Sequence, residues 1–242
     1  MSPRGIAFIL GAGPRIGRGV ASNLLDNGYS VALGSRAPDS SAQVSGNGRG
    51  VTISVDASNI QSVQDGFAQV KRELGTPNVV IYNVSAYTPA DSKDPFASIT
   101  PEVLERDNAA NITGAYTALR EAVLGFKSLS LTDSDTGGDG KTLPKVFIAT
   151  GNVTPFRPIP ASLPAGIGKS AIVHMIQIAA KSYSDDGFRF YYASQVSPKG
   201  GPVRQVDAGA HGAVFWDLIN RQTQGNWDVR FLADGSEVIS SG

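Results

Sequence analysis

Short apolar runs alternate with longer segments of helical periodicity along the whole chain. The runs are rich in β-branched and aromatic residues, as strands buried on both faces are. They lie at residues 6–10, 31–33, 51–55, 78–82, 145–149, 188–193 and 227–232. Helical spacing of apolar positions marks residues 15–27, 59–74, 101–126, 166–184 and 209–221. Parallel strands need crossover connections, so this alternation predicts an α/β fold: a Rossmann-type, doubly wound parallel sheet of about seven strands with helices on both faces.

The length of the chain indicates how many domains it forms, and its charge indicates which classes of partner it can bind. The 242 residues suit one domain spanning residues 1–242, and no linker divides them. The 21 Lys and Arg residues balance the 21 Asp and Glu residues, so no overall field favours nucleic acid or an acidic membrane surface. The first apolar run is too short for a signal segment or a membrane span. We therefore expect a cytoplasmic protein that acts on a small molecule, without nucleic acid or membrane partners.

Thiolate and metal chemistry find no support in the sequence. The chain has no Cys, which excludes disulfides, thiolate zinc sites and a Cys nucleophile. His174 and His211 are far apart and lack a ligand neighbour at helical spacing. We expect no metal site, and we interpret His174 as a core or interface histidine because it lies off the face of Lys169 on the same predicted helix.

A glycine-rich turn, GAGPRIGRG at residues 11–19, directly follows the first predicted strand. A strand that leads through such a turn into a helix directs backbone N–H groups and the positive end of the helix dipole at a diphosphate. Gly11 and Gly13 permit the tight turn, and Gly17, next to Ile16, permits close packing of the helix on the sheet. The alternative is a structural turn that binds no ligand.

The end of the second strand, LGSRAPDS, indicates which dinucleotide would bind. An acidic residue there would accept from a ribose 2′-hydroxyl and favour NAD(H), but Ser35 and Arg36 occupy the strand end. A guanidinium can bind a 2′-phosphate through two hydrogen bonds, and Arg15 in the glycine turn adds a second positive charge. The sequence therefore predicts NADP(H), the alternative being that both arginines are ordinary surface residues.

Four further landmarks follow the glycine turn in order: Val55-Asp56-Ala57, Asn83-Val84-Ser85-Ala86, Asn111-Ile112-Thr113-Gly114 and Pro198-Lys199-Gly200-Gly201. Their order and spacing resemble the short-chain dehydrogenase/reductase family over nearly the whole chain. The resemblance implies that the acidic side chain of Asp56 meets the adenine amine, that Ala57 and Asn83 belong to the cofactor site and that Pro198 lies near the nicotinamide. In that family the helix matching residues 166–183 packs against a partner subunit, so we expect a homodimer or a homotetramer.

The catalytic segment departs from the resembled family. There a Tyr stands four residues before the active-site Lys, and a Ser stands about thirteen residues before that Tyr. Lys169 matches the Lys, but Ala165 takes the place of the Tyr and Thr150-Gly151-Asn152 that of the Ser. The order IATGN, proline-rich loop and GIGKSA resembles a fungal branch of atypical reductases, some of which act on indole alkaloids in secondary metabolism as iminium reductases or cyclases.

The stretch PAGIGKSA, residues 164–171, also resembles part of a phosphate-binding P-loop. Leu163 stands where that loop requires its first Gly, and the proline-rich residues 154–164 precede it instead of a strand. Both departures disfavour a P-loop.

Four residues are candidates for the chemistry: Lys169, which would hold the nicotinamide ribose, Asn111, Thr150 and Asn152. Without a Tyr acid, hydride transfer to an iminium-like or conjugated small molecule is favoured, because an iminium carbon needs no proton donor. Tyr87 or Ser162 could instead replace the acid in an ordinary carbonyl reductase. A redox-neutral cyclase or isomerase, or a catalytically silent protein, would keep NADP(H) as a scaffold. The substrate pocket is expected among loops 86–98 and 153–164 and the segment after Pro198.

Overall fold

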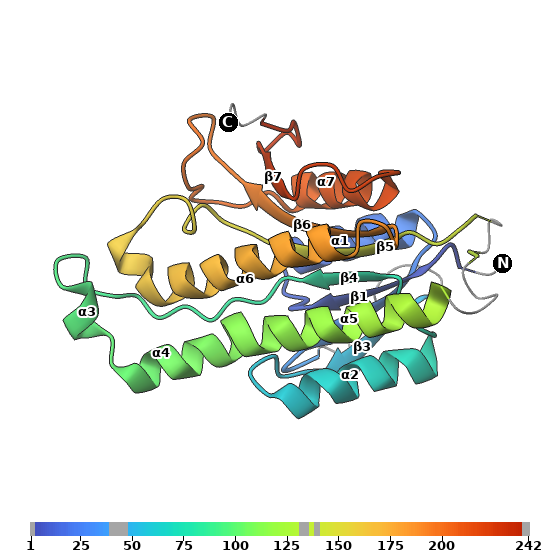
Figure 1. Cartoon of the computed structure of the whole chain (residues 1–242), viewed down its shortest axis with the longest axis horizontal. Coiled ribbons are helices and arrows are strands. Elements are labelled where there is room, and N and C mark those ends of the chain that lie inside the picture. Colours follow the sequence, from blue (N-terminus) through green and yellow to red (C-terminus); the bar gives the residue numbers. More distant parts are fainter. Residues whose placement is uncertain (1–2, 39–47, 131–135, 138–140, 239–242) are drawn as a thin grey trace.

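The computed structural model describes residues 3–38, 48–130, 136–137 and 141–238. A seven-stranded sheet with every neighbouring pair parallel forms the middle layer, in the order β3-β2-β1-β4-β5-β6-β7 (Figure 1). The strands are β1 (Ile6–Leu10), β2 (Ser30–Ser35), β3 (Gly50–Ser54), β4 (Val79–Tyr82), β5 (Lys145–Thr150), β6 (Phe188–Gln195) and β7 (Asp228–Phe231). The predicted doubly wound parallel sheet is confirmed.

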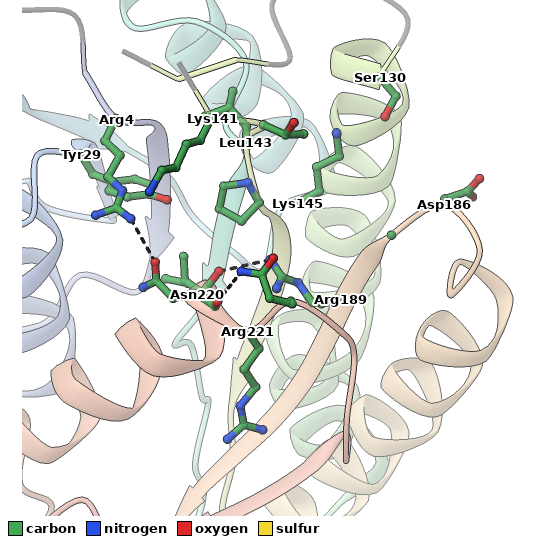
Figure 2. A pocket seen from close by; sticks show the side chains of 15 residues that line it. Arg4, Tyr29, Ser130, Lys141, Leu143, Lys145, Asp186, Arg189, Asn220 and Arg221 are labelled. Atoms are coloured by element: carbon green, nitrogen blue, oxygen red, sulfur yellow. Dashed lines mark hydrogen bonds between the residues drawn. The ribbon is translucent and has the colours of Figure 1, made fainter. Parts of the chain in front are cut away.

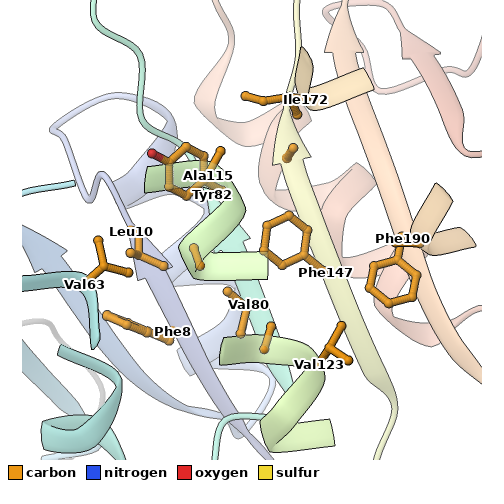
Figure 3. Close-up of a cluster of buried hydrophobic side chains, with 14 of the residues drawn as sticks. Phe8, Leu10, Val63, Val80, Tyr82, Ala115, Val123, Phe147, Ile172 and Phe190 are labelled. Carbon is orange, nitrogen blue, oxygen red and sulfur yellow. The ribbon is translucent and has the colours of Figure 1, made fainter. Parts of the chain in front are cut away.

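Helices cover both faces of the sheet, as the pattern predicts. One face packs against α1 (Ile16–Asp26) and α7 (Ala208–Asn220). The other packs against α2 (Ile60–Glu73), α5 (Ala115–Ser130) and α6 (Leu163–Ser182). On this second face Phe8, Tyr82 and Phe147 project from the strands between the helices (Figure 3). Burial of alternate strand residues on opposite faces is thus what holds the three layers together.

The predicted helix over residues 101–126 is three consecutive segments. It begins as α4 (Pro101–Asn108), widens into a π-helical stretch, η1 (Ala109–Gly114), and continues as α5. A Cβ at Gly114 would overlap the carbonyl oxygen of Ala57, so the segment that follows β3 lies directly on η1. A wide helical turn is a frequent feature of functional sites.

Two short helices lie in the loops that the sequence assigns to the substrate region. They are α3 (Pro95–Ser98) and η3 (Pro160–Ser162), each beginning with a Pro at its first position. The two loops are joined by a backbone hydrogen bond in which the Ala90 N donates to the Ala161 O at 3.0 Å. The stretch at residues 128–144 is polar and glycine-rich, which predicts a surface insertion, and it lies partly outside the described residues.

The expectation of a core position for His174 is wrong, because this side chain on α6 is exposed. The face of α6 that packs on the sheet carries Ile172, Val173 and Ile176 instead. An interface role for His174 stays a prediction. Residues 164–171 lie within α6, so Gly168-Lys169-Ser170 is helical and does not form a phosphate-wrapping loop.

Candidate cofactor-binding and active site

A cavity of about 410 Å³ lies at the carboxyl edge of the sheet, between the ends of β1 to β4 and the helix α4–η1. This is the edge at which doubly wound folds bind ligands, where the order of the strands reverses beside β1. Seven predicted cofactor residues line it: Gly11, Gly13, Ser35, Arg36, Asp56, Ala57 and Asn83. The fold therefore brings together residues that are up to 72 positions apart in sequence.

The other predicted site residues lie outside the lining of this cavity. Arg15 and Pro198 are exposed, and Gly17 and Lys169 are buried. Ile16 is the first residue of α1 and packs partly against the core. Thr150 ends β5, Asn152 follows it and Lys169 donates to the Thr150 oxygen, while Asn111 lies against Gly168 on α6.

Gly11 and Gly17 are required by the packing of the chain itself. Gly11 has φ of +83°, and a Cβ there would lie 2.5 Å from the oxygen of Asn83. The Asn83 side chain in turn donates from Nδ2 to the Gly11 oxygen, at 2.8 Å. A Cβ at Gly17 would lie 2.7 Å from the Cα of Ala12. These contacts fix the turn between β1 and α1.

Gly13 differs from its neighbours because no atom of the described residues requires a glycine there. A Cβ built at Gly13 meets nothing within 4 Å, and the residue lines the cavity. The first turn of α1 contains no acidic side chain, so its positive dipole end is not neutralised locally. Space above Gly13 at a helix N-terminus fits the diphosphate of a dinucleotide.

Charged side chains border the cavity at the ends of β2 and β3. Arg36 is exposed and Ser35 is half-buried at the end of β2. The pKa of Asp56 is lowered, mainly by hydrogen bonds from Ser58 and further by the positive charge of Arg36. Ser58 reaches Oδ1 of Asp56 with its backbone N at 2.9 Å and its hydroxyl at 2.7 Å. A hydrogen-bonded carboxylate and an exposed guanidinium thus border the same space.

Asn111 holds the loop that follows β4. Its Oδ1 accepts from the Ala86 N, and its Nδ2 donates to the Ala86 O, both at 2.8 Å. A Cβ at Gly168 would overlap the Cβ of Asn111, so α6 approaches η1 closely at this point. Both polar atoms of the Asn111 side chain are used by backbone, so its contribution is to position residue 86 and the start of the 86–98 loop.

Lys169 is buried and turned toward the backbone of β5. Its Nζ donates to the Thr150 oxygen at 2.8 Å. Burial lowers the pKa of Lys169 to about 8, because the charged ammonium loses its hydration. The amine therefore titrates close to physiological pH.

The buried amine makes the stability of the protein depend on pH. Its folded-state pKa lies below the usual value of 10.5, so the unfolded chain binds more protons between about pH 8 and 10.5. We expect the free energy of unfolding to rise across this window by about 2 to 3 kcal/mol relative to Lys169→Met. Urea unfolding of both proteins at several pH values measures this difference; parallel curves would contradict it, and Lys181→Met on the same helix is the exposed control.

Thr150 and Asn152 are placed differently from what an oxygen-polarising role requires. The hydroxyl of Thr150 is buried and has no hydrogen-bond partner among the described residues. Asn152 accepts with Oδ1 from the Thr154 N at 3.0 Å and from the Thr154 hydroxyl at 2.6 Å. Its acceptor is thus engaged in a local turn, which leaves the amide nitrogen as the group that could meet a substrate.

Sequence reasoning missed Tyr192 at this end of β5. Its hydroxyl accepts from the Asn152 N and donates to the Asn152 O, both at 3.0 Å. Burial raises the pKa of Tyr192. Tyr192 lies on β6, so only the pairing of β6 with β5 brings it here, and no sequence motif marks it.

The loops near the expected substrate region contact each other. The Tyr87 hydroxyl donates to the Ala161 oxygen at 3.3 Å while its ring stays largely exposed. Arg157 donates to the Lys199 oxygen at 3.4 Å, which ties the proline-rich loop to the segment after Pro198. Phe156, in the proline-rich loop, packs its ring edge-to-face on Tyr192, with 6.4 Å between the ring centroids.

A larger cavity, of about 600 Å³, lies at the opposite, amino edge of the sheet (Figure 2). Basic side chains predominate around it, and Asp186 is its one acidic lining residue among those described. Arg189 donates to the Ile219 oxygen at 3.2 Å and so caps the end of α7. None of the predicted site residues lines this cavity, so we place the candidate site at the smaller one.

The described part of the chain offers neither a metal cluster nor a membrane-spanning helix. It contains no group of three or more His, Cys, Asp or Glu side chains arranged to hold a metal ion. None of its helices is both long and apolar enough to cross a membrane.

Comparison with known proteins gives consistent results. The family model of the short chain dehydrogenases matches residues 5–134. The short chain dehydrogenase/reductase dmxR12 of Cryptosporiopsis sp. (strain 8999) is 33% identical over 243 residues, which cover 94% of this chain and 91% of that protein.

Solved structures share the fold at low sequence identity. A 3-ketoacyl-(acyl-carrier-protein) reductase from Brucella melitensis, complexed with NADH, is similar with a TM-score of 0.78 and 16% identity, over 96% of this chain and 98% of that chain. A metagenomic short-chain oxidoreductase in complex with NADP is similar with a TM-score of 0.76 and 16% identity, over the same shares of the two chains, 96% and 98%.

Proposed function

The chain belongs to the short-chain dehydrogenase/reductase family, and from this premise we propose that it is an NADPH-dependent reductase with a noncanonical active site. Its substrate is an imine-like, iminium-like or conjugated small molecule. Bound NADPH supplies the hydride. The protein binds and orients the dinucleotide and the substrate but offers no tyrosine acid, because Ala165 stands in that position on α6.

The observation that carries the cofactor assignment is the composition of the cavity at the ends of β1 and β2. Gly13 leaves open space for a diphosphate at the start of α1. Arg36 and Ser35 line the same cavity where an acidic residue would select NAD(H). The family relatives with bound NADH and bound NADP show that both dinucleotides occur on this fold, so the choice rests on Arg36.

Removing Arg36 is expected to abolish the preference for NADPH. The Arg36→Ala protein should bind NADPH about 10- to 100-fold more weakly, the equivalent of charged hydrogen bonds to a phosphate, and should bind NADH unchanged. Fluorescence titration of both nucleotides measures this. Arg72→Ala removes an exposed charge from the last turn of α2 and serves as the control. Equal affinities of the wild type for NADPH and NADH would contradict the assignment.

A redox-neutral role is the second candidate, supported by the substituted catalytic positions. Ala165 lacks a proton-donating group, and the Asn152 acceptor is engaged by Thr154. A cyclase, an isomerase or a silent protein would bind NADPH and not consume it. Following the absorbance of NADPH with a cyclic imine distinguishes the two functions, because only the reductase oxidises the dinucleotide.

We further propose that residues 1–242 act as one cytoplasmic NADP(H)-binding domain that assembles as a homodimer or homotetramer. Large apolar side chains are exposed on α5 and α6, namely Tyr116, Leu124, Ile167 and Ile178. The two helices lie side by side on one face of the molecule (Figure 1). Light scattering after size-exclusion chromatography measures the assembly.

A further inference from the structure

The cavity of about 600 Å³ at the amino edge of the sheet is larger than the candidate site at the carboxyl edge (Figure 2). Its lining runs from Ser130, the last residue of α5, past the starts of β5 and β6 to Asn220, the last residue of α7. Because α5 and α7 cover opposite faces of the sheet, the cavity reaches both faces. A space of this volume admits a small organic molecule.

Positive charge predominates in this lining. Among its described residues one is acidic, Asp186, and that residue is exposed. The basic residues are Arg4, Lys141, Lys145, Arg189 and Arg221. Arg221 has counter-ions of its own, because it pairs with Asp217 and Glu237. A ligand of negative charge is therefore favoured here over a neutral or cationic ligand.

Arg189, near the start of β6, is a buried cation that forms no ion pair with a carboxylate of the described residues. The residue is 6% exposed, and its guanidinium donates to the Ile219 oxygen at the end of α7, at 3.2 Å. Burial lowers the pKa of Arg189, because the charged form loses its hydration. A guanidinium nevertheless keeps its proton, and a neutral carbonyl does not balance its charge. An anion in the cavity would supply the missing negative charge.

Lys145 gives the same lining a second buried cation. It is 7% exposed and begins β5, the strand that pairs with β6 and places Val146 beside Arg189. Figure 2 shows the Lys145 amine on the side of Ser130, whereas Arg189 lies on the side of Asn220. Two cations that border different parts of one cavity suit a ligand with several negatively charged oxygens, such as a diphosphate, better than a single carboxylate.

We propose that the amino-edge cavity is a second ligand site, which binds a small molecule carrying a diphosphate group and uses Arg189 as a direct contact. None of the predicted cofactor residues lines this cavity, so the ligand binds there independently of NADP(H). A ligand that binds only the folded chain also stabilises the fold. The competing explanation is that the basic residues merely balance the negative dipole ends of α5 and α7, which terminate at this edge.

Inorganic pyrophosphate is the probe, titrated by isothermal calorimetry at constant ionic strength. Wild type is expected to bind it, and Arg189→Gln should bind it at least about 10-fold more weakly, because charged hydrogen bonds to the phosphate are lost. Arg72→Gln removes an exposed positive charge from the last turn of α2 and should keep the wild-type affinity. Gly13→Val, which fills the space for a diphosphate at the carboxyl edge, should keep it as well.

Three results would overturn the proposal. Absence of pyrophosphate binding by wild type would leave the basic side chains serving only the helix ends. Binding that is lost in Gly13→Val and kept in Arg189→Gln would place the anion at the glycine turn. Equal weakening in Arg189→Gln and Arg72→Gln would show a general effect of net charge. Should Arg189→Gln not fold, Lys145→Gln on the neighbouring strand takes its place, with the same comparison and the same expected loss.

Discussion

A cyclic iminium ion is expected to be reduced at least about 100-fold faster than a ketone of the same ring size, which is the lower end of what a missing general acid costs. Reduction of a ketone leaves an alkoxide that needs a proton as it forms. Hydride addition to an iminium carbon leaves a neutral amine and needs none. The side chain at position 165 is a methyl group, so the tyrosine of the family has no counterpart there.

The neighbouring groups do not obviously replace that acid. The Tyr87 hydroxyl donates to the Ala161 oxygen, and the Thr150 hydroxyl is buried at the end of β5. Initial rates of NADPH oxidation with the two substrates measure the ratio. A ketone rate equal to the iminium rate, and lost in Tyr87→Phe or Thr150→Val, would show instead an ordinary carbonyl reductase with a substituted acid. Thr223→Val, away from the carboxyl edge, is the control for a hydroxyl-to-methyl change.

Gly13→Val is expected to abolish dinucleotide binding, by about 100-fold or more, while the protein keeps its stability. The new side chain meets no protein atom within 4 Å at its Cβ, so the fold has no reason to reject it. It would project instead into the cavity at the N-terminus of α1, where the backbone must approach the diphosphate. Titration with NADPH and thermal unfolding of the same sample measure the two effects.

Gly11→Val is the contrasting variant. It places a β-branched residue at φ of +83° and its Cβ 2.5 Å from the Asn83 oxygen, so we expect loss of stability together with loss of binding. Wild-type affinity in Gly13→Val would mean that the glycine turn binds no diphosphate and is only structural.

The strands and helices were predictable because each is marked by a pattern of apolar residues within its own short segment of the sequence. The buried strand β5 is predicted at residues 145–149 and observed at Lys145–Thr150, since a continuous apolar run admits few other structures. The bulge η1 was not predictable in the same way. It depends on how closely the segment at Ala57 packs against Gly114, a contact between residues far apart in the chain.

Some residues of the candidate site could likewise be predicted from their local sequence, and others could not. The glycine turn, Ser35 and Arg36 were predicted because a turn and a strand end carry recognisable residue types, and Asp56 was predicted from the family resemblance. Gly11, Gly13, Ser35, Arg36 and Asp56 all line the same cavity. Tyr192 and the cavity-lining Asp107 were not found, because nothing in their local sequence distinguishes a site residue from a core tyrosine or a surface aspartate. His174 shows the converse error, since an apolar helix pattern does not tell which polar residue on it stays exposed.

Hydrophobic periodicity and backbone freedom are properties of short segments, so the layered α/β architecture and the position of the glycine turn follow from the order of amino acids alone. The pKa values and hydrogen-bond partners of the site residues depend on the folded chain. Burial lowers the pKa of Lys169 to about 8, and the buried Oδ2 of Asp107 has no donor among the described residues. Both effects arise from loss of water around a polar group, and that loss depends on atoms supplied by the whole fold.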